Sequence, residues 1–261
     1  MARFRSRKSK PEEGAEPPPA LAEDLVVIVD RAVNPYLVLF HDPTGFRAEQ
    51  VRALRNRLQA MNPDGEAKTL VVTSAARADG RTTTAINLAM ALAELERHEV
   101  VLVDADLRHP GVERYLNLPP GPGLADVLQG RVTLDKALRP AGFRRLMLLG
   151  ASGKAGNPAE VLAGTRIDEI YARLKERFQY VVVDTPPALA STDAGMLAAR
   201  ADGTLLVLRL EHTTKGHVKD AVRNLQDLCA NVLGSFVIEV RGADPEADKR
   251  LGYHDGEDGT Q

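Results

Sequence analysis

The sequence lacks several features that define common classes of protein. It contains no tryptophan, a single cysteine and only 4% aromatic residues. One cysteine excludes an intramolecular disulfide, and the shortage of aromatic rings argues against a surface that stacks nucleic acid bases. No apolar run approaches the roughly 18–20 residues of a membrane-spanning helix, and the cations near the N-terminus are not followed by the apolar segment of a signal peptide. The net charge of −2 and the 44% hydrophobic content are typical of a globular protein, for which we expect a cytoplasmic location.

Composition divides the chain into three parts. Residues 1–22 are charged, rich in proline and poor in apolar residues, which predicts a disordered basic tail that contributes to solubility or touches an anionic surface. Residues 243–261 are acidic and rich in glycine, which predicts a flexible tail. We therefore expect a single domain over residues 23–242, a length that suffices for one large α/β core.

Strand and helix patterns alternate through this central part. The strand patterns are continuous apolar runs, which are typical of a parallel sheet covered on both faces. The predicted fold class is therefore α/β, a doubly wound and mainly parallel sheet with helices on both faces. Cys229 falls on the apolar face of a predicted helix, where we expect a small core residue. The expected strands are 25–29, 36–40, 69–74, 100–104, 146–149, 180–184, 203–210 and 235–240, and the expected helices include 46–61, one beginning at Thr82, and 165–178.

The segment 69–95 is the most informative part of the chain. A short apolar strand, a loop of small residues and an apolar-periodic helix follow one another there. This order predicts a phosphate-binding loop, in which backbone N–H groups and a helix N-terminus hold an anion. The usual pattern has glycine at its first position and lysine before the helix, where this chain has Ala75 and Arg81. The residues expected to bind the phosphates are Ala76, Arg77, Ala78, Asp79, Gly80, Arg81, Thr82 and Thr83.

Acidic residues follow two of the expected strands. Asp104 and Asp106 come at the end of the strand 100–104, and Asp184 ends the strand 180–184. Because the carboxyl ends of parallel strands share one edge of a sheet, these carboxylates are expected near the loop, where with the Thr82 hydroxyl they are suited to Mg²⁺. Each aspartate also has an ordinary interpretation, as the cap of a following helix.

Taken together, these motifs resemble those of the bacterial tyrosine kinases that regulate capsule and exopolysaccharide export. The resemblance covers residues 36–240, and the chain is similar to the version whose cytoplasmic kinase is separate from its membrane-spanning co-polymerase. The segments that carry it are VTSAARADGRTTTAINLA, similar to a Walker A motif, VVLVDADLRHP, similar to the family's second acidic motif, and YVVVDTPPALASTDA, similar to a Walker B motif.

The resemblance implies ATP and Mg²⁺ as cofactors and phosphoryl transfer to tyrosine on a neighbouring subunit. It assigns catalytic positions to Asp104, Asp106 and Arg81, with Asp104 as base or metal-site residue and Arg81 on the phosphates. It implies that Thr82 binds the metal directly, whereas Asp106 and Asp184 position it through waters. Recruitment by the co-polymerase to the inner face of the membrane is implied as well, and no nucleic acid partner is expected.

Two further assignments come from the resemblance. Glu49, Arg52 and Arg55 match the E-x-x-R-x-x-R motif that joins subunits of relatives into a ring, which implies a homo-oligomer. Without the resemblance these residues are a solvated helix face with an i, i+3 ion pair. Tyr253 is the one tyrosine of the C-terminal tail and the expected phosphoacceptor.

The chain departs from the family pattern at the site itself. Ala78 replaces a loop glycine, which is costly if that residue has positive φ. Arg81 replaces lysine with a longer, forked cation, which we expect to grip phosphate from outside the loop. Glu239 stands where relatives often have asparagine near the adenine.

Three functions remain open from the sequence. The first is an ATP-dependent tyrosine autokinase, and the second is a catalytically impaired pseudo-kinase that acts as a scaffold of the same system. The third is a partitioning or cell-division ATPase of the same superfold, which usually carries another lysine where this chain has Ala76.

Overall fold

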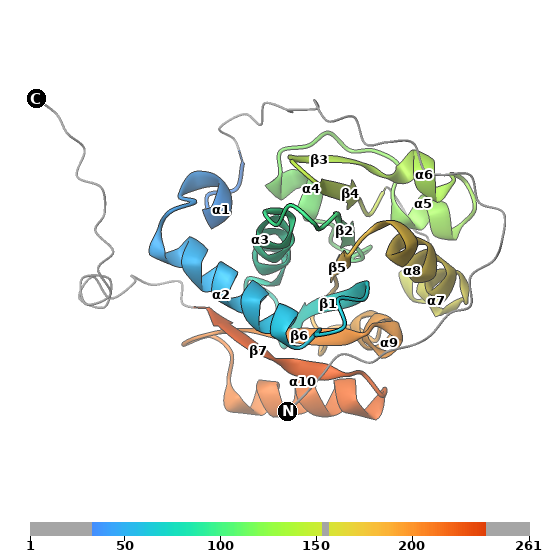
Figure 1. The fold of residues 1–261 in the computed structure, drawn as a ribbon. Helices are drawn as coiled ribbons and strands as arrows, with labels where there is room; N and C mark the ends of the chain where they lie inside the picture. Colours follow the sequence, from blue (N-terminus) through green and yellow to red (C-terminus); the bar gives the residue numbers. More distant parts are fainter. Residues whose placement is uncertain (1–32, 153–156, 239–261) are drawn as a thin grey trace, which may run out of the picture.

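A seven-stranded sheet forms the centre of the protein (Figure 1). The structure is a computed structural model that describes residues 33–152 and 157–238. The strand order is β3-β4-β2-β5-β1-β6-β7, and every neighbouring pair is parallel except β3 and β4. The strands are β1 (Lys68–Ser74), β2 (Val100–Asp104), β3 (Arg139–Phe143), β4 (Leu146–Leu149), β5 (Tyr180–Asp184), β6 (Gly203–Arg209) and β7 (Val232–Ile238).

Helices cover both faces of this sheet, as the continuous apolar strands require. Along β1, Leu70 and Val72 pack into one core with α1 to α4, whereas Val71 packs into a second core with α5 to α10. This alternation buries both faces of each central strand, so β1, β2 and β5 contain no exposed residue. The helices are α1 (Val38–His41), α2 (Phe46–Ala60), α3 (Arg81–Ala93), α4 (Val112–Tyr115), α5 (Leu124–Leu128), α6 (Leu134–Ala137), α7 (Pro158–Ala163), α8 (Arg166–Arg177), α9 (Asp193–Arg200) and α10 (Lys215–Asp227).

Two helices of the first face position the loop that follows β1. In α2 the buried residues Ala48, Val51, Leu54 and Leu58 recur at helical spacing and face the core. Helix α3 is buried continuously from Thr84 to Ala93, because it lies between the sheet and α2. The start of α3 is thereby fixed at the carboxyl edge of the sheet.

The predicted fold class is confirmed, and most of the predicted elements are present. Two local expectations are wrong, and one strand was not predicted. Residues 36–40 do not form a strand, because Val38–His41 is one turn of helix whose Leu39 packs into the first core. Strand β3 was not expected. Cys229 is exposed rather than buried, since α10 ends at Asp227 and Cys229 adopts a left-handed turn with φ 61°.

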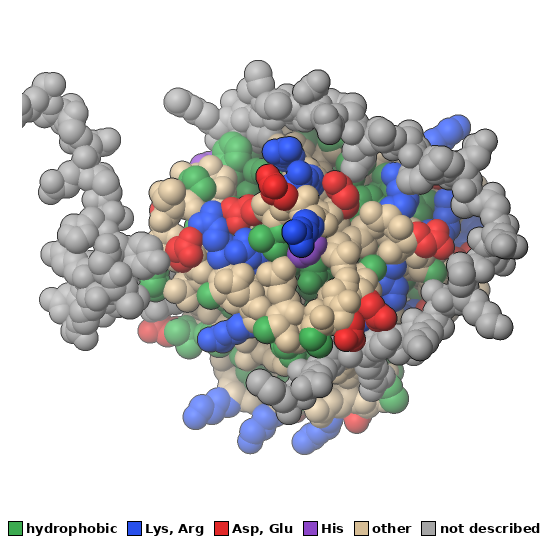
Figure 2. Space-filling model, viewed as in Figure 1, with side chains coloured by type: hydrophobic (Ala, Val, Ile, Leu, Met, Phe, Trp, Pro, Cys, Tyr) green, Lys and Arg blue, Asp and Glu red, His purple; other side chains and the backbone are tan. Residues whose placement is uncertain are grey.

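Other expectations lie outside the described residues. They are the strand at 25–29, both terminal tails, Glu239 and Tyr253. Within 33–152 and 157–238, no helix combines the length and the apolar character needed to cross a bilayer. On the face seen in Figure 2, hydrophobic side chains appear as small separate groups among charged and polar ones.

Candidate functional site

The loop between β1 and α3 is held in place by Asp79, whose side chain is fully buried. Its Oδ2 accepts a hydrogen bond from the backbone N–H of Ala76 at 2.8 Å, which closes the loop on itself. Its Oδ1 accepts from the Thr213 hydroxyl at 2.8 Å and lies 2.9 Å from Nδ1 of His212. Asp79 therefore anchors the loop to the turn after β6 through the contacts of its carboxylate.

Two residues of this loop have left-handed backbone conformations. Gly80 has φ 79°, and a Cβ at this position would also collide with Ile238 at the end of β7. Ala78 has φ 63°, the conformation in which its side chain is costly. The loop thus keeps the backbone course for which glycine is suited, although only one of the two positions holds glycine.

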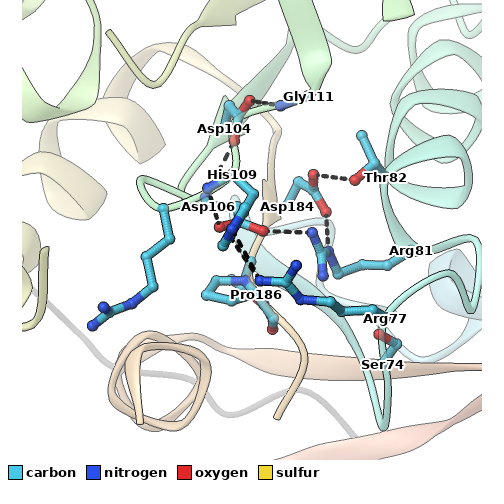
Figure 3. A network of polar contacts seen from close by, with 12 residues as sticks. Ser74, Arg77, Arg81, Thr82, Asp104, Asp106, His109, Gly111, Asp184 and Pro186 are labelled. Carbon is cyan, nitrogen blue, oxygen red and sulfur yellow. Dashed lines mark hydrogen bonds and ion pairs between the residues drawn. The ribbon is translucent and has the colours of Figure 1, made fainter. Parts of the chain in front are cut away.

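Arg81 is the first residue of α3, and its side chain turns inward (Figure 3). Nε donates to Asp184 Oδ1 at 2.9 Å, and Nη2 donates to Asp106 Oδ2 at 2.7 Å. Only 12% of the side chain is exposed. Burial by itself would lower the pKa of Arg81, but the carboxylates of Asp184 and Asp106 outweigh it and raise that pKa. The Arg81 guanidinium is therefore directed at the carboxylates beneath the loop.

Asp184 lies beneath Arg81 and Thr82. The Thr82 hydroxyl donates to Asp184 Oδ2 at 2.8 Å, so each carboxylate oxygen has one partner from the start of α3. The side chain is fully buried. Burial raises the pKa of Asp184, although the charge of Arg81 and the hydrogen bond from Thr82 oppose the rise.

Asp104 is also fully buried, and it pairs with Asp184 in the register of β2 and β5. Its Oδ2 accepts from the N–H groups of Gly111 and Val112, both at 3.0 Å, at the start of α4. Its Oδ1 accepts from the N–H of Asp106 at 3.2 Å. The helix-capping interpretation therefore describes its contacts. Burial, reinforced by the charge of Asp184, raises the pKa of Asp104 to about 8 against the effect of these N–H donors.

A cavity of about 690 Å³ opens above these groups at the carboxyl edge of the sheet. Of the residues expected to bind phosphate, Arg77 to Thr83 line this cavity, whereas Ala76 does not. Of the three aspartates, Asp106 lines the cavity, and Asp104 and Asp184 are not part of its lining. Its charged lining in the described residues comprises six arginines against two aspartates, together with His109. The arginines are Arg47, Arg77, Arg81, Arg108, Arg114 and Arg209, and the aspartates are Asp79 and Asp106.

Several of these lining residues were not expected from the sequence. Arg47 comes from α2 and Arg114 from α4, and each reaches the cavity only through the packing of its helix on α3. Arg209 ends β6, and the rule that ligands bind at the carboxyl ends of strands could have identified it. Phe236 and Ile238 come from β7 and supply apolar lining.

The residues expected to hold Mg²⁺ have suitable oxygen atoms but are already engaged. Asp106 and Asp184 are bonded to the Arg81 guanidinium, and Thr82 donates to Asp184. In the described part of the chain, no three side chains of His, Cys, Asp or Glu are grouped so as to hold a metal ion. In this arrangement the oxygens of Asp106 and Asp184 that would serve a divalent cation are instead held by Arg81 and Thr82, which does not fit direct binding of the ion.

The expected oligomerisation residues do not line the cavity, and they pair within the chain. Arg52 contacts Glu49 one turn earlier and donates from Nε to Glu94 at 2.9 Å. Arg55 donates from Nη1 to the same Glu94 at 3.0 Å and to the carbonyl of Ala91 at 3.1 Å. The expected i, i+3 ion pair is thus present, and the contacts of Arg52 and Arg55 with Glu94 join α2 to the end of α3.

Comparison with known proteins places this site in a family. Residues 67–233 match the family described as an AAA domain. The chain is 31% identical over 201 residues to the tyrosine-protein kinase YwqD of Bacillus subtilis, an alignment that covers 77% of this chain and 84% of YwqD. It is 31% identical to the putative tyrosine-protein kinase EpsB of Ralstonia nicotianae, covering 84% of this chain but only 28% of that longer protein.

Solved structures agree with these relatives. The kinase domain of the Escherichia coli tyrosine kinase ETK superposes with a TM-score of 0.75 at 26% identity, covering 82% of this chain and 84% of that domain. The septum site-determining protein MinD of Pyrococcus horikoshii shares the fold alone. It superposes with a TM-score of 0.59 at 21% identity, covering 71% of this chain and 77% of MinD. The match over residues 67–233 and the 31% identity to YwqD show that the chain belongs to the family of bacterial tyrosine-protein kinases.

Proposed function

We propose that the chain binds ATP in the cavity at the start of α3. The observation that carries the proposal is the arrangement of the loop and the first turn of α3 beside an arginine-lined hollow. The first turn of a helix has unpaired N–H groups and a positive dipole end, both of which favour phosphate. Six arginines line the wall, and four aspartates balance them in part, namely Asp79 and Asp106 of the lining and the ion-pair partners Asp184 and Asp193, so an excess of two positive charges (6 − 4) remains to suit a polyanion. The volume lies within the range of small-molecule sites.

The biological role that we infer is regulation of capsule or exopolysaccharide production by tyrosine phosphorylation. Its support is similarity to proteins named as tyrosine-protein kinases, among them CapB of Staphylococcus aureus and one encoded in a cps region of Klebsiella pneumoniae. In this proposal the protein works at the inner face of the membrane with a membrane-spanning co-polymerase. Tyr253 is its phosphoacceptor, and Glu49, Arg52 and Arg55 contribute to self-association.

The position of Arg81 favours a second candidate, a nucleotide-binding scaffold with little phosphoryl transfer. A lysine ammonium is a compact charge that fits within a phosphate loop, whereas the Arg81 guanidinium is committed to two carboxylates. A cation that is bound to carboxylates in the ground state contributes less to the charge that develops on a transferring phosphoryl group. Such a protein would respond to ATP by binding it, without turnover.

Binding and transfer can be measured separately on the full chain. Titration calorimetry with ATP and with ADP tests binding, and mass spectrometry after incubation with ATP and MgCl₂ tests phosphotyrosine. Phosphotyrosine on Tyr253 supports the autokinase. The scaffold is supported if the natural protein binds ATP but gains no phosphotyrosine. In that case Arg81→Lys should gain phosphotyrosine, and the surface control Arg173→Lys should not. Absence of binding for both nucleotides contradicts both candidates.

A further inference from the structure

The Arg81 guanidinium lies between two carboxylates, which belong to residues at the ends of the neighbouring strands β2 and β5. It bridges Asp184, at the end of β5, and Asp106, just after β2, with bonds of 2.9 and 2.7 Å (Figure 3). The Thr82 hydroxyl completes the group by donating to the second oxygen of Asp184. One side-chain cation therefore bonds to both carboxylates on which a metal-dependent site would rely.

The same guanidinium retains donors for a ligand. An arginine side chain has five N–H groups in a planar fork. Two of them are used in the bonds to Asp184 and Asp106, and Arg81 lines the cavity. Three N–H groups therefore remain for phosphate oxygens, and arginine forms paired hydrogen bonds with phosphate readily.

Other cations on the cavity wall are placed to complete the charge balance. Arg77 lies on the loop with its Nη2 3.0 Å from Nε2 of His109, and among the described residues neither side chain forms an ion pair with a carboxylate. Arg209 donates to the carbonyl of Ala78 at 3.2 Å and forms no ion pair with an acid within residues 33–152 and 157–238. Since these cations surround the loop, the site offers positive charge to a polyphosphate without an added metal ion.

A divalent cation at this place would meet two obstacles. It would have to displace Arg81 from both Asp106 and Asp184, and the displaced guanidinium has 12% of its surface exposed, so that it would lose buried partners. Mg²⁺ also requires near-octahedral oxygen coordination, whereas the oxygens of Asp184 are already directed at Arg81 and Thr82.

We infer that the cavity takes its nucleotide as the metal-free di- or triphosphate, with the Arg81 guanidinium supplying the positive charge between Asp106 and Asp184. The inference rests on the proposed binding of ATP. It assigns to Arg81 the role of a built-in counter-ion and makes binding independent of the divalent cation.

Calorimetric titration of the full chain with ATP, once in EDTA and once in MgCl₂, tests this. The expected Kd in EDTA equals the Kd in MgCl₂ within about threefold, a difference below ~1 kcal/mol. Binding that requires MgCl₂ would overturn the inference and leave the proposed ATP site intact. Absence of binding in both buffers would instead contradict the proposed function.

Variants connect this result to Arg81. In Arg81→Lys, whose ammonium lacks the fork that bridges two carboxylates, the Kd in EDTA is expected to exceed the Kd in MgCl₂ by about tenfold or more. The control Arg173→Lys changes an exposed arginine that pairs with Asp135, and it should match the natural protein in both buffers. Equal behaviour of the two variants would refute the assignment.

A second variant keeps the test decisive if Arg81→Lys does not fold. Asp106→Asn removes one carboxylate from Arg81 without removing the cation. Metal-free binding is then expected to be retained or strengthened, because Arg81 is less neutralised. A loss of affinity seen only in MgCl₂ would identify Asp106 as a metal ligand and contradict the inference.

Discussion

At the scale of single residues, two replacements distinguish the phosphate loop. Ala78 has a left-handed backbone although it carries a Cβ, and Arg81 turns into the acidic group beneath the loop. The first affects the stability of the loop, and the second determines which charge the ligand meets. Both positions were recognised in the sequence, but the direction of Arg81 was not, because it depends on where Asp106 and Asp184 lie in space.

Replacing Ala78 with glycine should stabilise the protein slightly. A left-handed conformation costs a residue with a Cβ about 1–2 kcal/mol, while glycine adds about 0.4–1 kcal/mol of unfolded-state entropy. The net expectation for Ala78→Gly is a gain of about 0.5 kcal/mol in the free energy of unfolding, measured by urea denaturation. The control Ala76→Gly changes a residue of the same loop that does not have positive φ, and it should lower the free energy of unfolding by a similar amount. A loss in both variants would mean that Ala78 bears no strain.

Asp104 should make stability depend on pH. Its pKa is about 8 in the folded protein, above the ordinary value near 3.8, so the folded state retains a proton that the unfolded state releases. Its contribution is therefore fully present below about pH 4 and is lost as the pH rises towards about 8, with a slope of at most about 1.4 kcal/mol per pH unit.

Urea unfolding of Asp104→Asn and of the natural protein at pH 5, 6, 7 and 8 measures this slope. Because asparagine does not ionise, the decline with pH should be smaller in the variant. Parallel curves for the two proteins would show that Asp104 is ionised throughout this range.

At the scale of elements, the apolar runs determined what the sequence could predict. Residues 100–104, 146–149 and 180–184 are strands at the bounds expected, because buried parallel strands are short continuous runs of apolar residues. The segment 36–40 has the same composition but leads into the helical turn Val38–His41, since Leu37 and Leu39 pack beside α3 and no strand of the described residues pairs with it. Strand β3 contains Pro140 and Gly142 and pairs irregularly at the sheet edge, so its sequence has no strand pattern.

The contact between α2 and α3 offers a test at this scale. Glu94 accepts hydrogen bonds from both Arg52 and Arg55, and its side chain is 34% exposed. Glu94→Gln should lower the free energy of unfolding by about 1 kcal/mol, and the loss should shrink in ~1 M salt. The control Asp135→Asn breaks pairs with Arg173 and Arg177 at a side chain that is 58% exposed, and should cost less. An equal decrease in the free energy of unfolding for both variants would show that the contacts of Glu94 with Arg52 and Arg55 stabilise the protein no more than exposed ion pairs do.

At the scale of the whole molecule, the sheet order determines which residues meet. Strand β5 lies between β1 and β2, so the loop after β1 and the acids after β2 and β5 share one edge. This part of the site was predictable from motif order alone. The arginines that α2 and α4 add to the cavity were not, because Arg47 and Arg114 belong to none of the recognised motifs and reach the cavity only by packing.

The crystal structure of the full chain grown with ATP and MgCl₂ tests the central claim most directly. We predict triphosphate on the backbone N–H groups around residues 77–82, with Arg81 still between Asp106 and Asp184 and no metal ion there. A magnesium ion bound by Thr82 and the aspartates with Arg81 turned away, or a cavity without nucleotide, would contradict the account.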